Sequence, residues 1–204
     1  MRNLLSLLFC LLLVSVNLHS QNKSGIIVGS GIGFESYSTN TNSKDFKIGI
    51  KNKISYNYDV QLGYRFRFEA GNAPTSKIFF DVDPLLKLQA FKTTKEYPTG
   101  KGGYNSPSVE AHDINFQFAI SPSANYRITN RLFAGVGVEP TWNIVTNGKH
   151  FDIPAFCRVG YSFKRVELAL TYRQGFLNVL DKNAFDKGRA SDLNISLFIP
   201  LFTK

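Results

Sequence analysis

The chain has 204 residues, of which 24 are basic and 15 acidic, so its formal charge is +9. Only 19% of the residues are charged while 43% are hydrophobic and 14% aromatic, which excludes long disorder because disorder requires few apolar residues and dense charge. The length fits one domain, and after residue 20 no stretch reaches the roughly 20 apolar residues of a membrane-spanning helix.

Residues 1–20 are typical of a secretory signal peptide. Arg2 gives the positive start, and an apolar run from Leu4 to Val16 follows it. This run is too short to span a membrane, so a membrane anchor is the weaker interpretation. We expect cleavage after Ser20, which leaves residues 21–204 as one exported domain. Cys157 is then the single cysteine, and a disulfide framework is excluded.

The exported domain alternates between apolar and polar residues, as β-strands with one apolar face do. Two connections support strand pairing: residues 129–131 preserve the parity, and residues 164–165 reverse it, as a two-residue hairpin requires. If the two long runs fold back on themselves, the strands number ten rather than eight. The eight alternating segments are 25–37, 46–68, 77–93, 112–128, 131–145, 151–163, 166–176 and 192–202.

Such a sheet forms either a soluble lipid-binding barrel with the apolar face inward, or a membrane barrel with that face toward lipid. The segments are long enough for the roughly 9–11 residues of a spanning strand, and short connections alternate with long ones. The polar face is rich in glycine and in charges of both signs, which suits a narrow lumen. We therefore predict an all-β, closed, antiparallel, up-and-down transmembrane β-barrel of eight strands over residues 21–204.

The glycine-rich first strand, two tight turns and an apolar last strand resemble the small outer-membrane β-barrel proteins of the OmpX and OmpA-transmembrane type. The turns are Tyr-Arg-Ile-Thr-Asn-Arg-Leu-Phe at 126–133 and Gly-Tyr-Ser-Phe-Lys-Arg-Val-Glu-Leu at 160–168. The resemblance implies the outer membrane of a Gram-negative bacterium, periplasmic termini and insertion by the barrel-assembly machinery. In that family the machinery reads a terminal aromatic residue; here Phe202 is near the end, with lumen-side parity.

Ten charged residues of the polar face are expected to neutralise one another inside the barrel, because buried charges are tolerated when paired. This predicts a plugged lumen. The ten are Glu35, Arg65, Arg67, Asp81, Asp83, Lys87, Glu139, Arg158, Glu167 and Arg173.

Aromatic residues near the strand ends predict the girdles by which barrels meet the membrane interfaces. These are Tyr64, Phe66, Tyr126, Trp142, Tyr161 and Phe163. Some apolar residues have the lumen-side parity instead, and we expect them to fill space between glycines or to mark bulges. They are Phe79, Leu85, Phe91, Phe133, Phe156, Phe198 and Pro200.

Sites for catalysis or metal binding have little support in the sequence. His112 and His150 fall short of the three or four ligands of a metal site. Each is near an aspartate, Asp113 or Asp152, but adjacent strand residues face opposite sides, so neither pair forms a ready dyad. The Gly-rich run at 29–33 departs from a nucleotide-binding motif at Phe34. We expect no catalytic residue, metal or cofactor.

The predicted function is that of a non-enzymatic barrel with a structural or interaction role in the cell envelope. A small-solute pore is the alternative, and a lipid-modifying enzyme using His112 or His150 a further one. Expected partners are outer-membrane lipid, an envelope protein that meets the long strands, and lipopolysaccharide phosphates; export argues against nucleic acid. The basic residues in or near the outer loops are Lys44, Lys92, Lys95, Lys101, Lys149, Lys182, Lys187 and Arg189.

Overall fold

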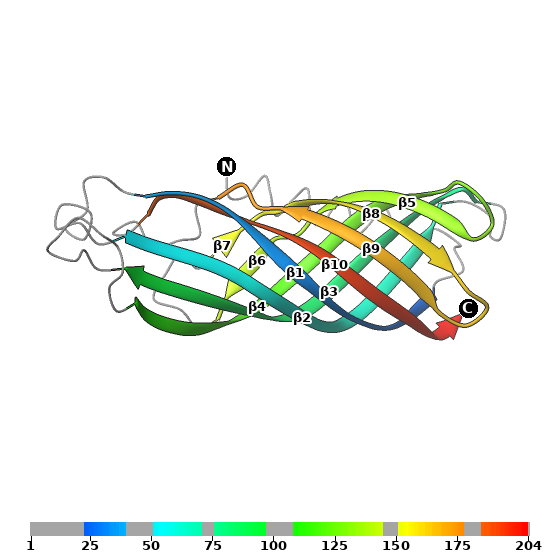
Figure 1. The fold of residues 1–204 in the computed structure, drawn as a ribbon. Coiled ribbons are helices and arrows are strands. Elements are labelled where there is room, and N and C mark those ends of the chain that lie inside the picture. Colours follow the sequence, from blue (N-terminus) through cyan, green and yellow to red (C-terminus); the bar gives the residue numbers. More distant parts are fainter. Residues whose placement is uncertain are drawn as a thin grey trace, which may run out of the picture.

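The computed structural model describes residues 23–39, 51–70, 76–96, 108–144, 151–177 and 185–203, so the expected signal peptide lies outside the described residues. Its strands form one antiparallel sheet that closes into a barrel, since β3 pairs with both β2 and β4 (Figure 1). The strands are β1 Lys23–Thr39, β2 Lys51–Glu69, β3 Ile78–Glu96, β4 Ser108–Arg127, β5 Leu132–Val138, β6 Thr141–Asn143, β7 Phe151–Asp152, β8 Ala155–Ser162, β9 Glu167–Gln174 and β10 Phe185–Thr203.

The ten strands make eight barrel strands, which confirms the predicted closed barrel. β5 and β6 pair with successive parts of β4, so together they form one barrel strand. β8 pairs with β5 and β7 pairs with β6, so β7 and β8 form the next one. The segments predicted at 131–145 and 151–163 are interrupted at Pro140 and Pro154, because proline has no N–H for a ladder. The wall remains joined there, since the Glu139 amide donates to the Pro154 carbonyl at 2.8 Å. The two long runs do not fold back on themselves within the described residues.

The apolar face of the sheet points outward, as predicted for a membrane barrel. Ile114 and Val136 are each 64% exposed on the outer wall, whereas Arg65 is 1% and Glu139 0% exposed inside. A soluble lipid-binding barrel would show the reverse arrangement. Within the described ranges, no helix is long and apolar enough to cross a membrane.

The two tight turns form as the parity predicts. The Ile128 amide donates to the Leu132 carbonyl at 2.9 Å across the three-residue connection, and the Phe163 amide to the Val166 carbonyl at 2.7 Å across the two-residue one. Both chain ends of the described barrel lie near these turns, because Phe198 of the last strand pairs with Glu167, just after the 164–165 turn, and Lys23 pairs with Thr203. We call this the turn end of the barrel and the opposite side the loop end.

Several strands extend further toward the loop end than the alternation predicts. β3 continues to Glu96 and β4 starts at Ser108, although 94–111 was expected to be a loop, because each extension is paired with the other. β10 starts at Phe185, well before the predicted 192, because β1 pairs along it as far as Thr39. Residues 46–50 of the predicted second strand lie outside the described residues.

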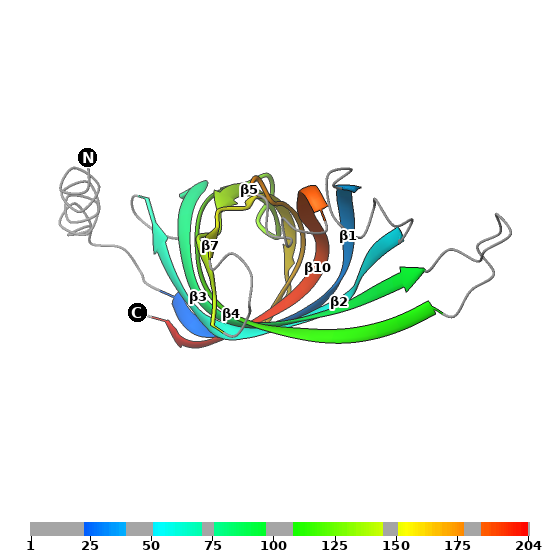
Figure 2. The same cartoon turned by 90° about the vertical axis from the view of Figure 1, so that its left-hand side faces the viewer.

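The barrel wall divides at the loop end. β1 pairs with β2 only over Lys23–Gly31, although it follows β10 along its whole length. Figure 2 shows the loop-end parts of β2, β3 and β4 leaning away from β1 and β10. The barrel therefore carries a projecting three-stranded sheet beyond its closed part.

Bulges change the register that strict alternation predicts. Within β10 the pairing shifts between Pro200 and Phe202, and both Leu201 and Phe202 are exposed on the outside. The lumen-side assignment of Phe202 is therefore wrong, because the extra residue reverses the side on which the strand's last side chains lie. In β2 a similar shift lies between Tyr56 and Tyr58.

Candidate functional site: the filled lumen

Nine of the ten charged residues predicted for the lumen are buried there, and they form two connected clusters. They come from β2, β3, β8 and β9, and from the Glu139–Pro140 interruption. The side chain of the tenth, Glu35, lies outside the described residues. Because successive strand residues face opposite sides, the alternation that builds the apolar wall also places these charges inside.

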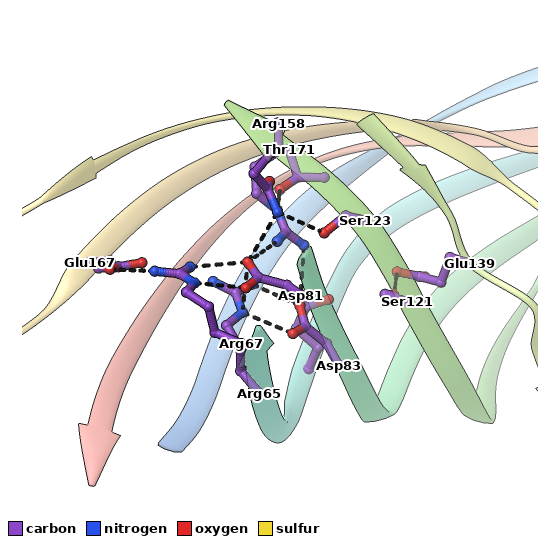
Figure 3. Close-up of polar contacts among 12 residues, drawn as sticks. Arg65, Arg67, Asp81, Asp83, Ser121, Ser123, Glu139, Arg158, Glu167 and Thr171 are labelled. Carbon is purple, nitrogen blue, oxygen red and sulfur yellow. Dashed lines mark hydrogen bonds and ion pairs between the residues drawn. The ribbon is translucent and has the colours of Figure 1, made fainter. Parts of the chain in front are cut away.

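The first cluster lies in the turn-end half of the lumen (Figure 3). Arg65 forms a bidentate pair with Asp83, from Nε to Oδ1 at 2.8 Å and from Nη2 to Oδ2 at 2.7 Å. Arg67 forms another with Asp81, at 2.7 and 3.0 Å, and its third nitrogen donates to Glu167 at 2.6 Å. Such fork-to-carboxylate pairs fix direction as well as charge, so this cluster is a rigid crosslink between β2, β3 and β9.

Arg158 of β8 closes the first cluster from the opposite wall. Its Nη2 donates to Asp83 Oδ2 at 3.2 Å, its Nη1 lies 3.6 Å from Asp81 Oδ2, and its Nε donates to Thr171 at 3.4 Å. The three arginines therefore share two aspartates at the centre of the lumen. If one of these residues were made neutral, its partner's charge would stay buried with neither an opposite charge nor water to stabilise it.

The second cluster surrounds Glu139, nearer the loop end. Glu139 accepts from Lys87 Nζ at 2.7 Å, from Ser121 Oγ at 2.6 Å and from Arg173 Nε at 2.8 Å. Arg173 also donates to Asp192 at 2.8 Å. Since Glu139 sits where Pro140 interrupts the strand, the irregular backbone places this carboxylate among cations from two other strands.

Three polar residues that were left out of the predicted network extend the second cluster. Gln61 accepts from Arg173 at 2.9 Å and donates to Asn194 at 3.0 Å, and Asn194 donates to Asp59 at 3.2 Å. Asp192 was also missed. The alternation already gives all four residues the polar parity: Asp59 and Gln61 lie in the predicted segment 46–68, and Asp192 and Asn194 in 192–202.

Aromatic rings close the turn-end side of the first cluster. The Arg67 guanidinium lies 4.2 Å from the centre of the Phe79 ring, which meets Phe133 edge-on at 5.4 Å. Phe198 lies beneath Arg65 and Arg67, at 5.1 and 5.4 Å. Cation–π contacts are strongest when desolvated, so these inward phenylalanines are part of the plug. Phe91 is the one predicted residue of this set whose side chain lies outside the described residues.

Glycines opposite the inward rings make room for them. Phe133 pairs with Gly160 and Phe156 with Gly137 across β5 and β8. A Cβ at Gly160 would lie 2.2 Å from Phe133 Cζ, and one at Gly137 would lie 2.5 Å from Phe156 Cζ. The expectation that apolar residues fill the lumen between glycines is confirmed at these pairs.

The turn-end mouth is closed by a further pair that sequence reasoning missed. Arg127 Nη2 donates to Glu69 Oε1 at 2.7 Å, and its Nη1 donates to the Ser76 carbonyl at 2.7 Å. The guanidinium also lies 4.7 Å from the Phe79 ring centre. Glu69 was assigned to a turn, whereas β2 includes it, and only the strand assignment gives it the lumen parity.

The predicted interface aromatics lie on the outer wall in two groups. Near the turn end, the rings of Tyr64 and Phe66 lie 4.9 Å apart and those of Tyr161 and Phe163 lie 5.0 Å apart, with Tyr126 exposed on β4. Trp142 lies toward the loop end, with its ring 6.0 Å from Phe118 and 5.3 Å from Phe151.

Most charged groups of the lumen are paired with one another, as Arg67 with Asp81 and Arg173 with Glu139. Within the described ranges no group of three or more His, Cys, Asp or Glu residues could hold a metal ion. His112 is exposed on β4, and His150 lies outside the described residues. Asp152 accepts from the amides of Ile153 and Leu177.

No family model and no curated protein matches the sequence. Solved structures with a similar chain path include the outer membrane protease OmpT from Escherichia coli, at 8% identity and a TM-score of 0.37 over 89% of this chain and 96% of that one. The outer membrane protein OprG from Pseudomonas aeruginosa is 13% identical, with a TM-score of 0.38 over 88% and 92%. The NanC porin is 8% identical, with a TM-score of 0.32 over 89% and 100%. At these values the likeness assigns no activity to the chain.

Proposed function

We propose that the protein is a non-enzymatic outer-membrane β-barrel whose lumen is filled by side chains and whose role in the envelope is structural or interactive. The observation that carries this proposal is the buried network of Arg65, Arg67, Arg158, Asp81 and Asp83 across the lumen. A crosslinked centre of this kind favours a closed lumen over a water-filled one. We place the turn end and both termini in the periplasm, as expected for an exported barrel.

Planar bilayer recordings test the closed lumen. We expect the reconstituted protein to be silent under conditions in which an open porin gives stepwise currents. The double variant Arg67→Ser/Glu167→Ser leaves the net charge unchanged and removes both the Arg67–Glu167 contact, at 2.6 Å, and the Arg67–Asp81 pair, so it should raise the current above background. Reproducible stepwise conductance of the unaltered protein would reject the proposal.

A small-solute pore is the second candidate, because two buried acids have no ion-pair partner among the described residues. They are Asp59, whose Oδ1 lacks any hydrogen-bond partner, and Asp152. A pore lined by such acids would prefer cations. The reversal potential in a salt gradient would show this preference, and Asp59→Asn should abolish it.

The interactive role rests on strand edges at the loop end. In the described part of the chain, β2 from Lys51 to Tyr58 pairs only with β3, and β4 from Ser108 to Asn115 pairs only with β3. Such an edge can accept an extended segment of a partner protein as a further strand. A photo-crosslinker at the exposed Val109 should capture protein, whereas one at Val136 on the closed wall should capture lipid only. Equal yields at both positions would contradict an edge partner.

Lipopolysaccharide and the barrel-assembly machinery remain proposed partners. Of the outer basic residues, Arg189 is exposed, and Lys92 pairs with Glu110 at 2.8 Å. Lys44, Lys101, Lys149 and Lys182 lie outside the described residues, and so do the side chains of Lys95 and Lys187. A lipid-modifying enzyme is the remaining alternative; unchanged lipid A composition after His112→Ala would count against it.

A further inference from the structure

The turn end of the barrel carries a rim of positive charge. The exposed cations Lys77, Arg131, Lys164 and Arg165 lie there, together with the half-buried Lys23. Among the described residues of this end, every exposed charged side chain is basic. The loop-end strands differ, because they carry charges of both signs, as in the pair Lys92–Glu110.

The acids of the turn end do not neutralise this rim, because they point into the lumen. Glu69 is buried against Arg127 at 2.7 Å, and Glu167 against Arg67 at 2.6 Å. Both carboxylates are therefore already paired with lumen arginines. The outer cations are left without a counter-charge from the described part of the chain.

Three of the cations lie on neighbouring turns and form the centre of the rim. The turn that carries Arg131 adjoins the one that carries Lys164 and Arg165, since Leu132 pairs with Tyr161 and the Ser162 amide donates to the Arg131 carbonyl at 2.7 Å. Each turn is too short to fold away from the barrel. The three side chains thus surround one small area of the rim.

The aromatic girdle fixes the depth of this rim in a membrane. Arg131 Nη1 donates to the Tyr161 hydroxyl at 3.3 Å, and the Tyr161 ring packs on Phe163 directly before Lys164. Tyrosine on the outer wall of a barrel sits at the level of the lipid headgroups. Cations that extend just beyond it are therefore level with the phosphates.

We propose that the turn-end rim, formed by Lys23, Lys77, Arg131, Lys164 and Arg165, binds the headgroups of anionic phospholipids in the leaflet that surrounds it. The partner is a lipid surface rather than an acidic protein, because the girdle holds the cations at the height of the phosphates, and because Lys23 on β1 and Lys77 before β3 extend the rim beyond the two adjoining turns. This inference requires that the barrel spans a membrane, and it does not depend on whether the lumen is closed.

Spin-labelled lipids test the proposal in the protein reconstituted into phosphatidylcholine vesicles. Electron paramagnetic resonance gives the share of spin-labelled phosphatidylglycerol and of spin-labelled phosphatidylcholine held at the protein surface. We expect the unaltered protein to prefer phosphatidylglycerol. The triple variant Arg131→Gln/Lys164→Gln/Arg165→Gln should lose that preference by about threefold or more, because each cation near a lipid surface contributes to anion binding. High salt should weaken the preference of the unaltered protein.

A charge-matched control changes cations at the loop end instead, in Lys92→Gln/Lys187→Gln/Arg189→Gln. This control should keep the full preference for phosphatidylglycerol. Heat-modifiable gel migration verifies that each variant is a folded barrel, and the single variant Lys164→Gln replaces the triple one if that fails to fold. The proposal is overturned if the unaltered protein has no preference, if the rim variant retains it, or if both triple variants lose it equally. Conductance plays no part in this readout, so a conducting barrel would refute the closed lumen and leave the rim intact.

Discussion

At the residue scale, the centre of the barrel depends on matching buried arginines with buried carboxylates. Asp81 shows how closely they are matched, since its carboxylate lies 2.7 Å from Arg67 and 3.6 Å from both Arg65 and Arg158. Removing a buried partner leaves an uncompensated charge, which costs more than the pair itself contributes. The stability of the fold is therefore most sensitive at the shared aspartates.

Replacing Asp81 by asparagine tests this sensitivity. The substitution retains the shape but removes the negative charge from among three arginines, so we expect the free energy of unfolding to fall by about 3–5 kcal/mol. Urea unfolding in detergent micelles, followed by the fluorescence of Trp142, measures the change. Glu167→Gln is the matched control, because Glu167 contacts Arg67 alone and should give a smaller loss. Equal losses in the two variants would contradict the shared role of Asp81.

The glycine–phenylalanine pairs give a second test at this scale. Gly160→Ala places a Cβ against the Phe133 ring, at 2.2 Å in the unrelaxed structure, and the ring is confined by Phe79 and Arg67. We expect a loss of about 1–3 kcal/mol, as overpacking usually produces. The double variant Gly160→Ala/Phe133→Leu should recover part of it. A Gly160→Ala protein as stable as the unaltered one would show that the lumen is less tightly filled than the pairing indicates.

At the element scale, the strands divide into a closed barrel and a projection. The lumen clusters lie in the closed part of the barrel. At the loop end, β3 pairs with β2 and β4, and the described start of β4 pairs with β3 alone. A projection that contributes nothing to the lumen clusters should be dispensable for folding. This separates its role from that of the wall.

Shortening the β3–β4 hairpin tests that separation. Thr94 pairs with Glu110, so replacing residues 95–109 by Asn-Gly should close a two-residue turn at this pair. We expect the shortened protein to show the same heat-modifiable migration and a melting temperature within a few degrees, roughly the effect of less than 1 kcal/mol. A barrel that no longer folds would mean that the projection stabilises the wall.

The sequence predicts the elements better than their limits, for physical reasons that differ from place to place. Alternation identifies the wall because exposed and buried side chains recur with a period of two residues along the strands. It does not show how far β10 extends before residue 192, since pairing with β1 rather than polarity decides that. It also misses the bulge near Phe202, where one additional residue reverses the faces without any change in composition.

The lumen network is predictable as a set and less so as pairs. Parity places Arg67, Asp81 and Glu167 on one face, but which of them meet depends on the register and shear of the closed barrel. Glu69 falls outside the predicted segment 46–68, and only the longer β2 gives it the lumen parity. Arg127, Asp59, Gln61 and Asn194 have the polar parity within the predicted segments, but parity alone does not show which residues they meet across the lumen.

At the scale of the whole molecule, an apolar wall faces outward around a charged and aromatic centre. A soluble barrel of the same topology would have its apolar face inside and its polar face outside. Here Ile114 and Val136 are exposed on the outside, and Arg65 and Glu139 are buried inside. Such an apolar outer wall requires a lipid environment, since it would aggregate in water.

Cys157 offers the most direct measurement, because it is exposed on the outer face of β8, opposite Val136 and Tyr172. A nitroxide on this cysteine in reconstituted vesicles should collide more with oxygen, which concentrates in lipid, than with a water-soluble nickel reagent. Asn130→Cys in a Cys157→Ser background, at the exposed turn, should show the opposite ratio. If the nickel reagent reaches Cys157 as readily as it reaches the turn, the outer wall is in contact with water and the barrel is not a membrane-spanning one.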